Sequence, residues 1–147
     1  MALVKHLLDR KGVKVWSVSS KTTIHEALQT LKKYDIGALP VIDETKLVGI
    51  LSERDIVRKL DELGSFKTSL PVEDLMITSV YFVEPSNSVE ECMKLMTNKH
   101  IRHLPVVENG KVVGVISIGD LVKEIIADRE TMIKSLENYI TGQGIVG

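Results

Sequence analysis

The sequence predicts an α+β fold built from two similar β-α-β-β-α units in tandem, followed by a C-terminal helical tail. Three observations predict it: the chain repeats itself, apolar spacing changes between helical and strand-like within each copy, and the composition is that of a globular domain. Of 147 residues, 44% are hydrophobic and 27% are charged. This balance is typical of a folded chain with a sizeable core and excludes a disordered or fibrous protein.

The internal repeat has an offset of 65 residues. Residues 18–61 align with residues 83–126 without a gap, and twelve of the aligned positions are identical, concentrated on Pro, Gly, Ser and Asp. Such repetition predicts two copies of one structural unit. The expected boundaries are a first unit with its N-terminal lead-in at 1–63, a linker at 64–71, a second unit at 72–128 and a tail at 129–147, all in one compact module.

Each copy begins with a lead-in and a short strand. The lead-in is expected to be helical, at residues 3–8 before the first copy and at residues 72–76 before the second. The first strand is placed at Trp16, Ser17 and Val18 in one copy and at residues 81–83 in the other.

A helix and a hairpin follow in each copy. Apolar residues recur at helical intervals over residues 24–31 and 89–96, which predicts an amphipathic helix. Two β-rich runs around a polar turn come next, at residues 38–51 and 104–116, and Asn109-Gly110 is the stronger of the two turn signals.

A second helix closes each copy, beginning near Ser52 or Ser117. After the second copy, apolar residues continue at helical spacing through Met132, Ile133, Leu136, Tyr139 and Ile140. Neither repeat needs this tail, so we expect it to pack on the module or on a second chain.

Charge and cysteine content limit the classes of function. Nineteen basic and twenty acidic residues give a net charge of −1, which argues against nucleic-acid binding. The single cysteine, Cys92, excludes an intrachain disulfide and multi-cysteine zinc sites, and the four histidines lack helical ligand spacing, so we expect no metal. No apolar stretch approaches the roughly 18 residues of a membrane span, and the first residues do not look like a signal peptide. We expect a cytoplasmic protein.

Two runs of sequence carry a resemblance to a known family. IGALPVIDETKLVGILSERD and IRHLPVVENGKVVGVISIGD resemble the two halves of a cystathionine-beta-synthase (CBS) domain pair, also called a Bateman module. The resemblance covers residues 1–128, and the segment from Leu95 to Val122 with its helical tail is similar to the stand-alone CBS-pair proteins. It implies that the two units pack with pseudo-two-fold symmetry and leave two clefts for ligands such as AMP, ADP, ATP, NAD or S-adenosylmethionine.

The family motif Gly-h-h-(Ser/Thr)-x-x-Asp, in which h is apolar, occurs in full at residues 49–55 and 114–120. The resemblance implies that Ser52 and Ser117 contact phosphate and that Asp55 and Asp120 hold the ribose. The chemistry of these groups is consistent with that assignment, because a carboxylate accepts the two ribose hydroxyls and a helix N-terminus favours phosphate. The alternative is structural: Ser-x-x-Asp is close to a capping box that satisfies the N–H groups of the helix itself. For the serines both roles are compatible.

Further site candidates follow from the residues that flank these motifs. Arg54, with Arg58 one turn later, is expected to clamp phosphate, as are Arg102 and His103, which precede the second Leu-Pro. The alternative for the last two is a solvated arginine and a partly buried histidine. Thr22 is a phosphate candidate or a helix cap, and Trp16 is an adenine contact or a buried anchor. The remaining candidates for the adenine pocket are Ser17, Val18, Gly37, Ala38, Leu39, Pro40, Val83, Leu104 and Pro105.

The sequence therefore predicts a regulatory protein that binds an adenine nucleotide without catalysis and without a catalytic cofactor. Its expected partners are AMP, ATP or NAD as ligand, a second copy of the chain, and a regulated protein. Two alternatives stay open: a ligand-independent dimeric scaffold or regulator of a partner enzyme, and a nucleotide hydrolase. The hydrolase is disfavoured because the chain has no Gly-x-x-x-x-Gly-Lys loop, Gly-x-Ser-x-Gly elbow or His-Glu-x-x-His helix.

Overall fold

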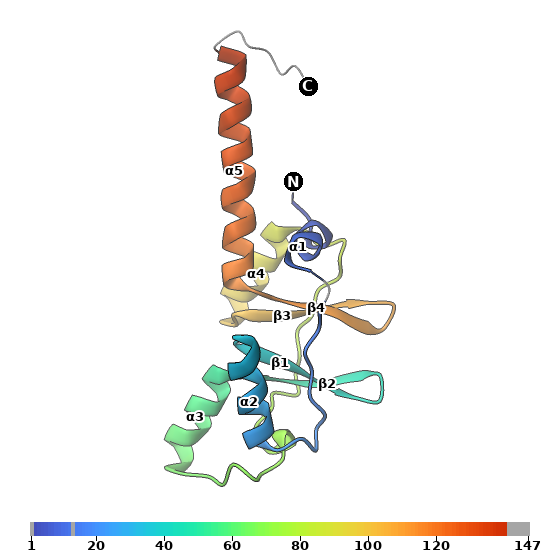
Figure 1. Ribbon diagram of the computed structural model, residues 1–147, viewed down its shortest axis with the longest axis vertical. Helices are drawn as coiled ribbons and strands as arrows, with labels where there is room; N and C mark the ends of the chain where they lie inside the picture. Colours follow the sequence, from blue (N-terminus) through green and yellow to red (C-terminus); the bar gives the residue numbers. More distant parts are fainter. Residues whose placement is uncertain (1, 13, 141–147) are drawn as a thin grey trace.

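The computed structural model describes residues 2–12 and 14–140. Its elements are α1 (Val4–Lys11), α2 (Ile24–Tyr34), β1 (Ala38–Asp43), β2 (Lys46–Ser52), α3 (Glu53–Leu63), the 3₁₀ turn η1 (Val72–Asp74), α4 (Val89–Lys99), β3 (His103–Glu108), β4 (Lys111–Ser117) and α5 (Ile118–Ile140). Figure 1 shows one hairpin in each half of the molecule and α5 extending well beyond them. The α+β class, the tandem units and the C-terminal helix are confirmed.

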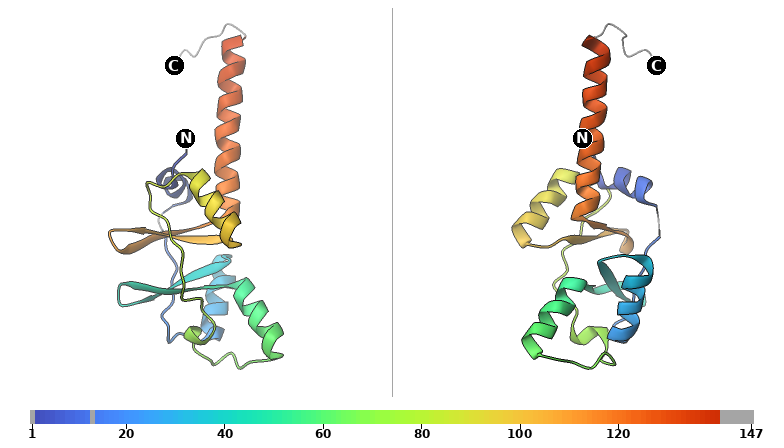
Figure 2. Two further views of the ribbon diagram at one scale, coloured as in Figure 1. Left: turned by 180° about the vertical axis from the view of Figure 1, so that it is seen from behind. Right: turned by 60° about the vertical axis from the view of Figure 1, so that its left-hand side comes forward.

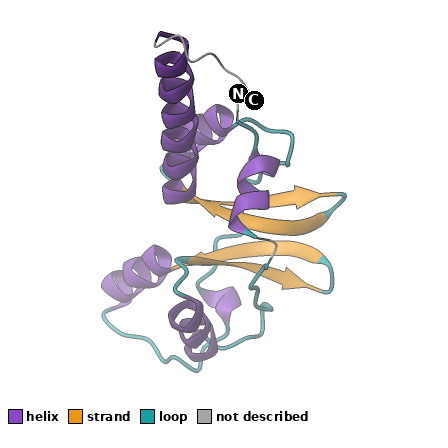
Figure 3. Ribbon diagram, turned by 45° about the horizontal axis from the view of Figure 1, so that its top comes forward, coloured by secondary structure: helices purple, strands orange, loops and turns teal. Residues whose placement is uncertain are grey.

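The two hairpins are copies of one another in register as well as in sequence. β1 pairs antiparallel with β2, and β3 with β4, and each pairing has a bulge at the equivalent place, between Val41 and Ile42 or between Val106 and Val107. The polar turns predicted from the sequence contain residues at positive φ, Glu44 in the first hairpin and Asn109 and Gly110 in the second. The hairpins face each other in the middle of the molecule with the helices on the outside (Figure 3).

The first strand of each unit is much shorter than the sequence suggested. It is a single parallel bridge, Val18 to Val41 in one unit and Val83 to Val106 in the other. The reason is local: directly after the bridge, the N–H of Ser19 donates to Oγ1 of Thr22 at 3.1 Å, and the N–H of Glu84 donates to Oδ1 of Asn87 at 2.7 Å. These side-chain bonds turn the chain toward the next helix before a second ladder pair forms.

The two lead-in segments are exchanged between the units. α1 contributes Val4, Leu7 and Leu8 to the core of the second unit, whereas Val72 and Leu75 lie in the core of the first. Figure 2 shows α1 beside the second unit in both views. The sequence placed each lead-in with the copy that it precedes, and the packing differs from that assignment.

Matching backbone bonds hold this exchange in place. The N–H of Val4 donates to the carbonyl of Asn87 at 2.9 Å, and the N–H of Val72 donates to the carbonyl of Thr22 at 2.7 Å. Asn87 and Thr22 are equivalent positions in the repeat. The first N–H of each helix also finds its acceptor there, since Ile24 donates to the carbonyl of Leu70 at 2.8 Å and Val89 to that of Ala2 at 3.0 Å.

The repeated glycine of the family motif lies where an exchanged lead-in approaches the sheet. A β-carbon on Gly49 would lie 2.5 Å from Sδ of Met76 and 3.0 Å from the carbonyl oxygen of Ile77. One on Gly114 would lie 2.6 Å from Cδ2 of Leu8. The glycines thus permit the close approach of chain segments far away in sequence.

The C-terminal tail is not a separate element. The second helix of the second unit runs without interruption from Ile118 to Ile140. Beyond the module its apolar side chains are largely exposed, with Met132 at 64% and Leu136 at 56% of full exposure. The apolar side chains of this part of α5 therefore do not pack on the module. The expected apolar contacts of Tyr139 and Ile140, and residues 141–147, lie outside what the structure describes.

Candidate functional site

Two cavities lie between the units, and each is walled by both of them. The larger has a volume of about 660 Å³ and the smaller about 170 Å³. The larger is lined by the start of α5 in the second unit, by residues 35–38 at the α2–β1 junction of the first unit, and by residues of the segment that follows α1. The smaller is lined by the equivalent parts: the start of α3, residues 100–103 and Ile77. We name them the Asp120 cleft and the Asp55 cleft.

The Ser-x-x-Asp turns are helix caps and cleft walls at once. At the start of α3, the N–H and the hydroxyl of Ser52 donate to Oδ2 of Asp55 at 3.0 and 2.7 Å, and the N–H of Asp55 donates to Oγ of Ser52 at 3.1 Å. At the start of α5, the N–H of Ser117 donates to Oδ2 of Asp120 at 2.8 Å, and the reciprocal bond is 3.1 Å. The capping role is therefore present in both copies.

Capping leaves part of each carboxylate available. All of the side-chain bonds to Asp55 and Asp120 within residues 2–12 and 14–140 use Oδ2. In both residues Oδ1 has no hydrogen-bond donor from that part of the chain. A carboxylate oxygen accepts two hydrogen bonds, so each aspartate can cap its helix and still hold a ligand hydroxyl.

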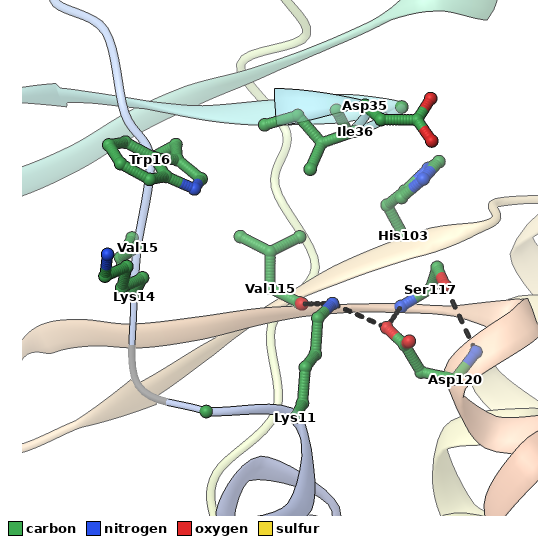
Figure 4. A pocket seen from close by; sticks show the side chains of 13 residues that line it. Lys11, Lys14, Val15, Trp16, Asp35, Ile36, His103, Val115, Ser117 and Asp120 are labelled. Carbon is green, nitrogen blue, oxygen red and sulfur yellow. Dashed lines mark hydrogen bonds and ion pairs between the residues drawn. The ribbon is translucent and has the colours of Figure 1, made fainter. Parts of the chain in front are cut away.

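Lys11, at the end of α1, lies in the wall of the Asp120 cleft. Its ammonium donates to the carbonyl of Val115 at 2.7 Å and to Oδ2 of Asp120 at 2.6 Å (Figure 4). Burial raises the pKa of Asp120, but the hydrogen bonds from Lys11 and Ser117 and the charge of Lys11 outweigh it, and the net pKa is lowered. The carboxylate is consequently ionised at neutral pH.

His103 is the shared wall of the two clefts. It lines both of them, as does Gly37, and a β-carbon on Gly37 would lie only 2.9 Å from Nε2 of His103. Burial lowers the pKa of His103, and the charge of Lys11 lowers it further. The imidazole is therefore neutral at pH 7 and adds no charge to either cleft.

The Asp55 cleft contains the arginines. Arg54, Arg58 and Arg102 line it, opposed by Glu53 and Asp55. Nη1 of Arg54, from the first unit, reaches the carbonyl of His100 in the second unit at 3.5 Å. The structure thus brings three guanidinium groups from both units to one small cavity.

The predicted site residues fall into two groups. Those that line a cleft are Ser52, Arg54, Asp55, Arg102, His103, Ser117, Asp120, Gly37 and Ala38. Those that line neither cleft are Thr22, Ser17, Val18, Leu39, Pro40, Val83, Leu104 and Pro105.

Burial and a turn contact explain five members of the second group. Val18, Leu39, Val83 and Leu104 are buried in the two apolar cores, where the strands pack on helices rather than face the clefts. Thr22 is held by Ser19 in the turn before α2, where its hydroxyl accepts a backbone bond. Trp16, in contrast, lines the Asp120 cleft and stacks on Tyr34, with ring centroids 3.5 Å apart and planes at 11°.

Several residues that line the clefts were missed by sequence reasoning. In the Asp120 cleft they are Lys11, Gly12, Lys14, Val15, Asp35, Ile36 and Val115, and in the Asp55 cleft Ile50, Glu53, Ile77, His100 and Ile101. The difference that identifies the lysines requires the structure, because the two lead-ins can be aligned only by the glycines that they contact. Leu8 contacts Gly114 and Met76 contacts Gly49, so the two residues are equivalent in the two lead-ins. The bridge residue Val18 lies ten positions after Leu8, whereas Val83 lies seven positions after Met76. The longer segment is the basic one.

Cys92 lies outside the two clefts, and its surroundings do not activate the thiol. Burial raises the pKa of the Cys92 thiol to about 11, so the sulfur stays protonated and unreactive. Within residues 2–12 and 14–140, no three His, Cys, Asp or Glu side chains come together as metal ligands. No helix in the same ranges is long and apolar enough to cross a bilayer.

Comparisons with known proteins identify relatives of both the sequence and the fold. The family model of the CBS domain matches residues 4–62 and 72–127. The CBS domain-containing protein CBSX3, mitochondrial, of Arabidopsis thaliana is 32% identical over 136 residues, 89% of this chain and 66% of that protein, so the chain spans just under two thirds of its length. The CBS domain-containing protein YhcV of Bacillus subtilis is 34% identical over 113 residues, 77% of this chain and 80% of that protein.

Solved structures of CBS domain proteins have the same fold as this chain. The CBS domain structure of NE2398 has a TM-score of 0.79 and 43% identity, covering 84% of this chain and 97% of its own. CBSX2 in complex with AMP has a TM-score of 0.71 and 28% identity, covering 88% and 99%. The CBS domain pair of MJ0100, in complex with 5′-methylthioadenosine and S-adenosyl-L-methionine, has a TM-score of 0.72 and 26% identity, covering 87% and 98%.

Proposed function

The chain belongs to the CBS domain family, and from this premise we propose that it is a regulatory module that binds adenosine-containing ligands in the clefts between its units, without catalysis. The observation that carries the proposal is the pair of Ser-x-x-Asp turns, each with one carboxylate oxygen left for a ligand in a cleft walled by both units. Structures of relatives hold AMP in CBSX2 and methylthioadenosine or S-adenosylmethionine in MJ0100.

The chemistry of the clefts supports a nucleoside ligand. Asp55 and Asp120 offer acceptors for ribose hydroxyls, and the first turns of α3 and α5 present the positive end of the helix dipole to phosphate. The Asp120 cleft, at about 660 Å³, falls within the range of roughly 300–1,000 Å³ that is usual for small-molecule sites. The Asp55 cleft is below that range, and in our proposal the units move apart there when a whole nucleotide binds.

Such a movement provides the regulatory output that we propose. Because each cleft is walled by both units, a ligand that bridges them favours one relative orientation of the units over others. A partner protein that recognises this orientation responds to the concentration of the ligand. Catalysis is not part of the proposal, since the sequence has no Gly-x-x-x-x-Gly-Lys loop, Gly-x-Ser-x-Gly elbow or His-Glu-x-x-His helix.

We include a homodimer in the proposal. Val57 on α3 and Val122 on α5 occupy equivalent positions of the repeat and are both exposed, as are Leu60 and Leu63 further along α3. On α5 the exposed apolar face continues through residues 126–136. A second copy of the chain covers these helices most economically, because one symmetric contact buries both apolar faces.

Calorimetric titration tests the ligand. The purified chain is titrated with AMP, ADP, ATP, NAD, NADH and S-adenosylmethionine, and the titrations are repeated with Asp55→Ala and Asp120→Ala. Each variant is expected to lose the binding of its own cleft while the other cleft still fills, with a ligand-dependent rise in melting temperature in the wild type. Absence of binding by all six compounds would contradict the proposal and favour the scaffold function.

A further inference from the structure

The two clefts differ in what accompanies the Ser-x-x-Asp turn. In the Asp120 cleft, the Lys11 ammonium bonds to Asp120, whereas the side-chain bonds to Asp55 within the described ranges come from Ser52 alone. Lys11 comes from the lead-in that is exchanged onto the second unit, and it lies in the segment that is longer than its counterpart. The two clefts therefore differ in the lead-in segment that lines them, whereas their Ser-x-x-Asp turns are the same.

The Lys11 ammonium is held in position with one donor to spare. An ammonium has three N–H donors, and the bonds to Val115 and Asp120 use two of them. The side chain is 42% exposed, so the third donor is accessible from the cleft. Since Leu8 packs against Gly114 one turn earlier, the end of α1 has little freedom to carry Lys11 away.

Basic and acidic side chains lie on different walls of the Asp120 cleft. Lys11 and Lys14 both come from the segment at the end of α1, whereas Asp35 lies on the opposite wall with Ile36 (Figure 4). Asp120 is already paired with Lys11, and His103 is neutral. The Lys11–Asp120 pair carries no net charge, so near the Ser117 turn a ligand meets the remaining N–H donor of Lys11 and the positive end of the α5 dipole, with Asp35 on the opposite wall.

We propose that Lys11 makes the Asp120 cleft selective for adenosine ligands that carry a phosphate over those that carry a thioether or a sulfonium group in its place. The third N–H of Lys11 makes a charge-assisted hydrogen bond to a phosphate oxygen, while Asp120 holds the ammonium in place. An uncharged thioether offers only a weak acceptor to this donor, and a sulfonium places a positive charge beside an ammonium. This selectivity depends on the function proposed above and specifies the ligand class for one of the two sites.

The experiment compares four ligands on matched variants. AMP, adenosine, 5′-methylthioadenosine and S-adenosylmethionine are titrated calorimetrically into the chain carrying Asp55→Ala, so that the Asp120 cleft dominates the signal. Lys11→Met is then added, with Lys5→Met as the control. Lys5 lies on the same helix, is exposed, and loses the same charge when it is replaced.

The expected result is a preference for AMP over the other three ligands of roughly tenfold or more, which Lys11→Met abolishes by weakening AMP alone. Lys5→Met keeps the preference, and Lys11→Arg, which retains the charge, keeps most of it. Added salt weakens AMP binding more steeply with Lys11 present than with Met in its place.

Two outcomes would overturn the selectivity while leaving nucleotide binding intact: equal affinity of the starting chain for AMP and methylthioadenosine, or an equal loss of AMP and adenosine in Lys11→Met. The second outcome would assign Lys11 a structural role. If none of the four ligands binds even to the unsubstituted chain, the proposed function itself fails, and the selectivity fails with it.

Discussion

Replacing Gly49 by Ala tests the contact between the repeated glycine and the exchanged lead-in. The new β-carbon would lie 2.5 Å from Sδ of Met76, which can rotate away, and 3.0 Å from the carbonyl oxygen of Ile77, which cannot. That carbonyl accepts the N–H of Ile50 at 3.0 Å, and the reciprocal bond is 2.9 Å. The methyl group therefore pushes on a paired backbone segment.

The magnitude follows from two opposing contributions. Overpacking of this kind costs about 1–3 kcal/mol, whereas Ala in place of Gly within a strand stabilises by about 0.5–1 kcal/mol through the unfolded chain. The two contributions leave a net loss of about 0–2.5 kcal/mol, and because the Ile77 carbonyl cannot move, we expect Gly49→Ala in the upper part of this range, at about 1–2.5 kcal/mol or about 2–10 °C in melting temperature.

Gly114→Ala is the matched comparison at the equivalent position. There the β-carbon would lie 2.6 Å from Cδ2 of Leu8, the end of a side chain, with the next atoms at 3.6 Å or more. Rotation of Leu8 relieves this contact, so the expected net loss is at most about 1 kcal/mol.

Urea unfolding of both variants and the wild type, at one protein concentration, measures the difference. Equal stability of Gly49→Ala and the wild type, or a larger loss in Gly114→Ala, would refute the reasoning, because it depends on a backbone atom being less able to move than a side-chain end.

Four further predictions concern the cap of α4, the stability of the chain at low pH, the exposed face of α5 and the reactivity of Cys92. Ser88→Ala, which removes the cap of α4 away from both clefts, is expected to cost about 1 kcal/mol in urea unfolding, and no loss would contradict the capping bond. Because the pKa of Asp120 is lowered in the folded chain, its contribution to stability is present above its unfolded pKa and is lost as pH falls through the folded value; Asp120→Asn should flatten the acid limb of a stability–pH curve, and an unchanged limb would exclude this contribution. Ile133→Asp on the exposed face of α5 is expected to shift the chain to monomer in sedimentation velocity while Lys134→Gln does not, and a monomeric wild type would exclude the dimer. Cys92 should resist a thiol reagent in the folded chain and react only after unfolding; rapid labelling of the native chain would contradict its burial and its raised pKa.

Local rules and the repeat were sufficient to predict the elements. Capping residues, helical spacing and turn residues act over a few neighbours, so the helices, the hairpins and both Ser-x-x-Asp turns could be predicted from the sequence. The two aspartates also share their position in the repeat, and this equivalence predicts the same role for both. The first strands are single bridges in the structure, and the turns at Ser19 and Glu84 stop each ladder from continuing past Val18 or Val83.

The repeat by itself determined that two equivalent units exist and that a helix start in each carries Ser and Asp. Only the tertiary structure decided which lead-in belongs to which core, and hence that Lys11 stands beside Asp120 across 109 positions of sequence. The physical reason is that periodicity shows which face of a segment is apolar but not which of two similar cores will bury it. Both cores offer a glycine for close approach, and the choice between Gly49 and Gly114 depends on the path of the whole chain.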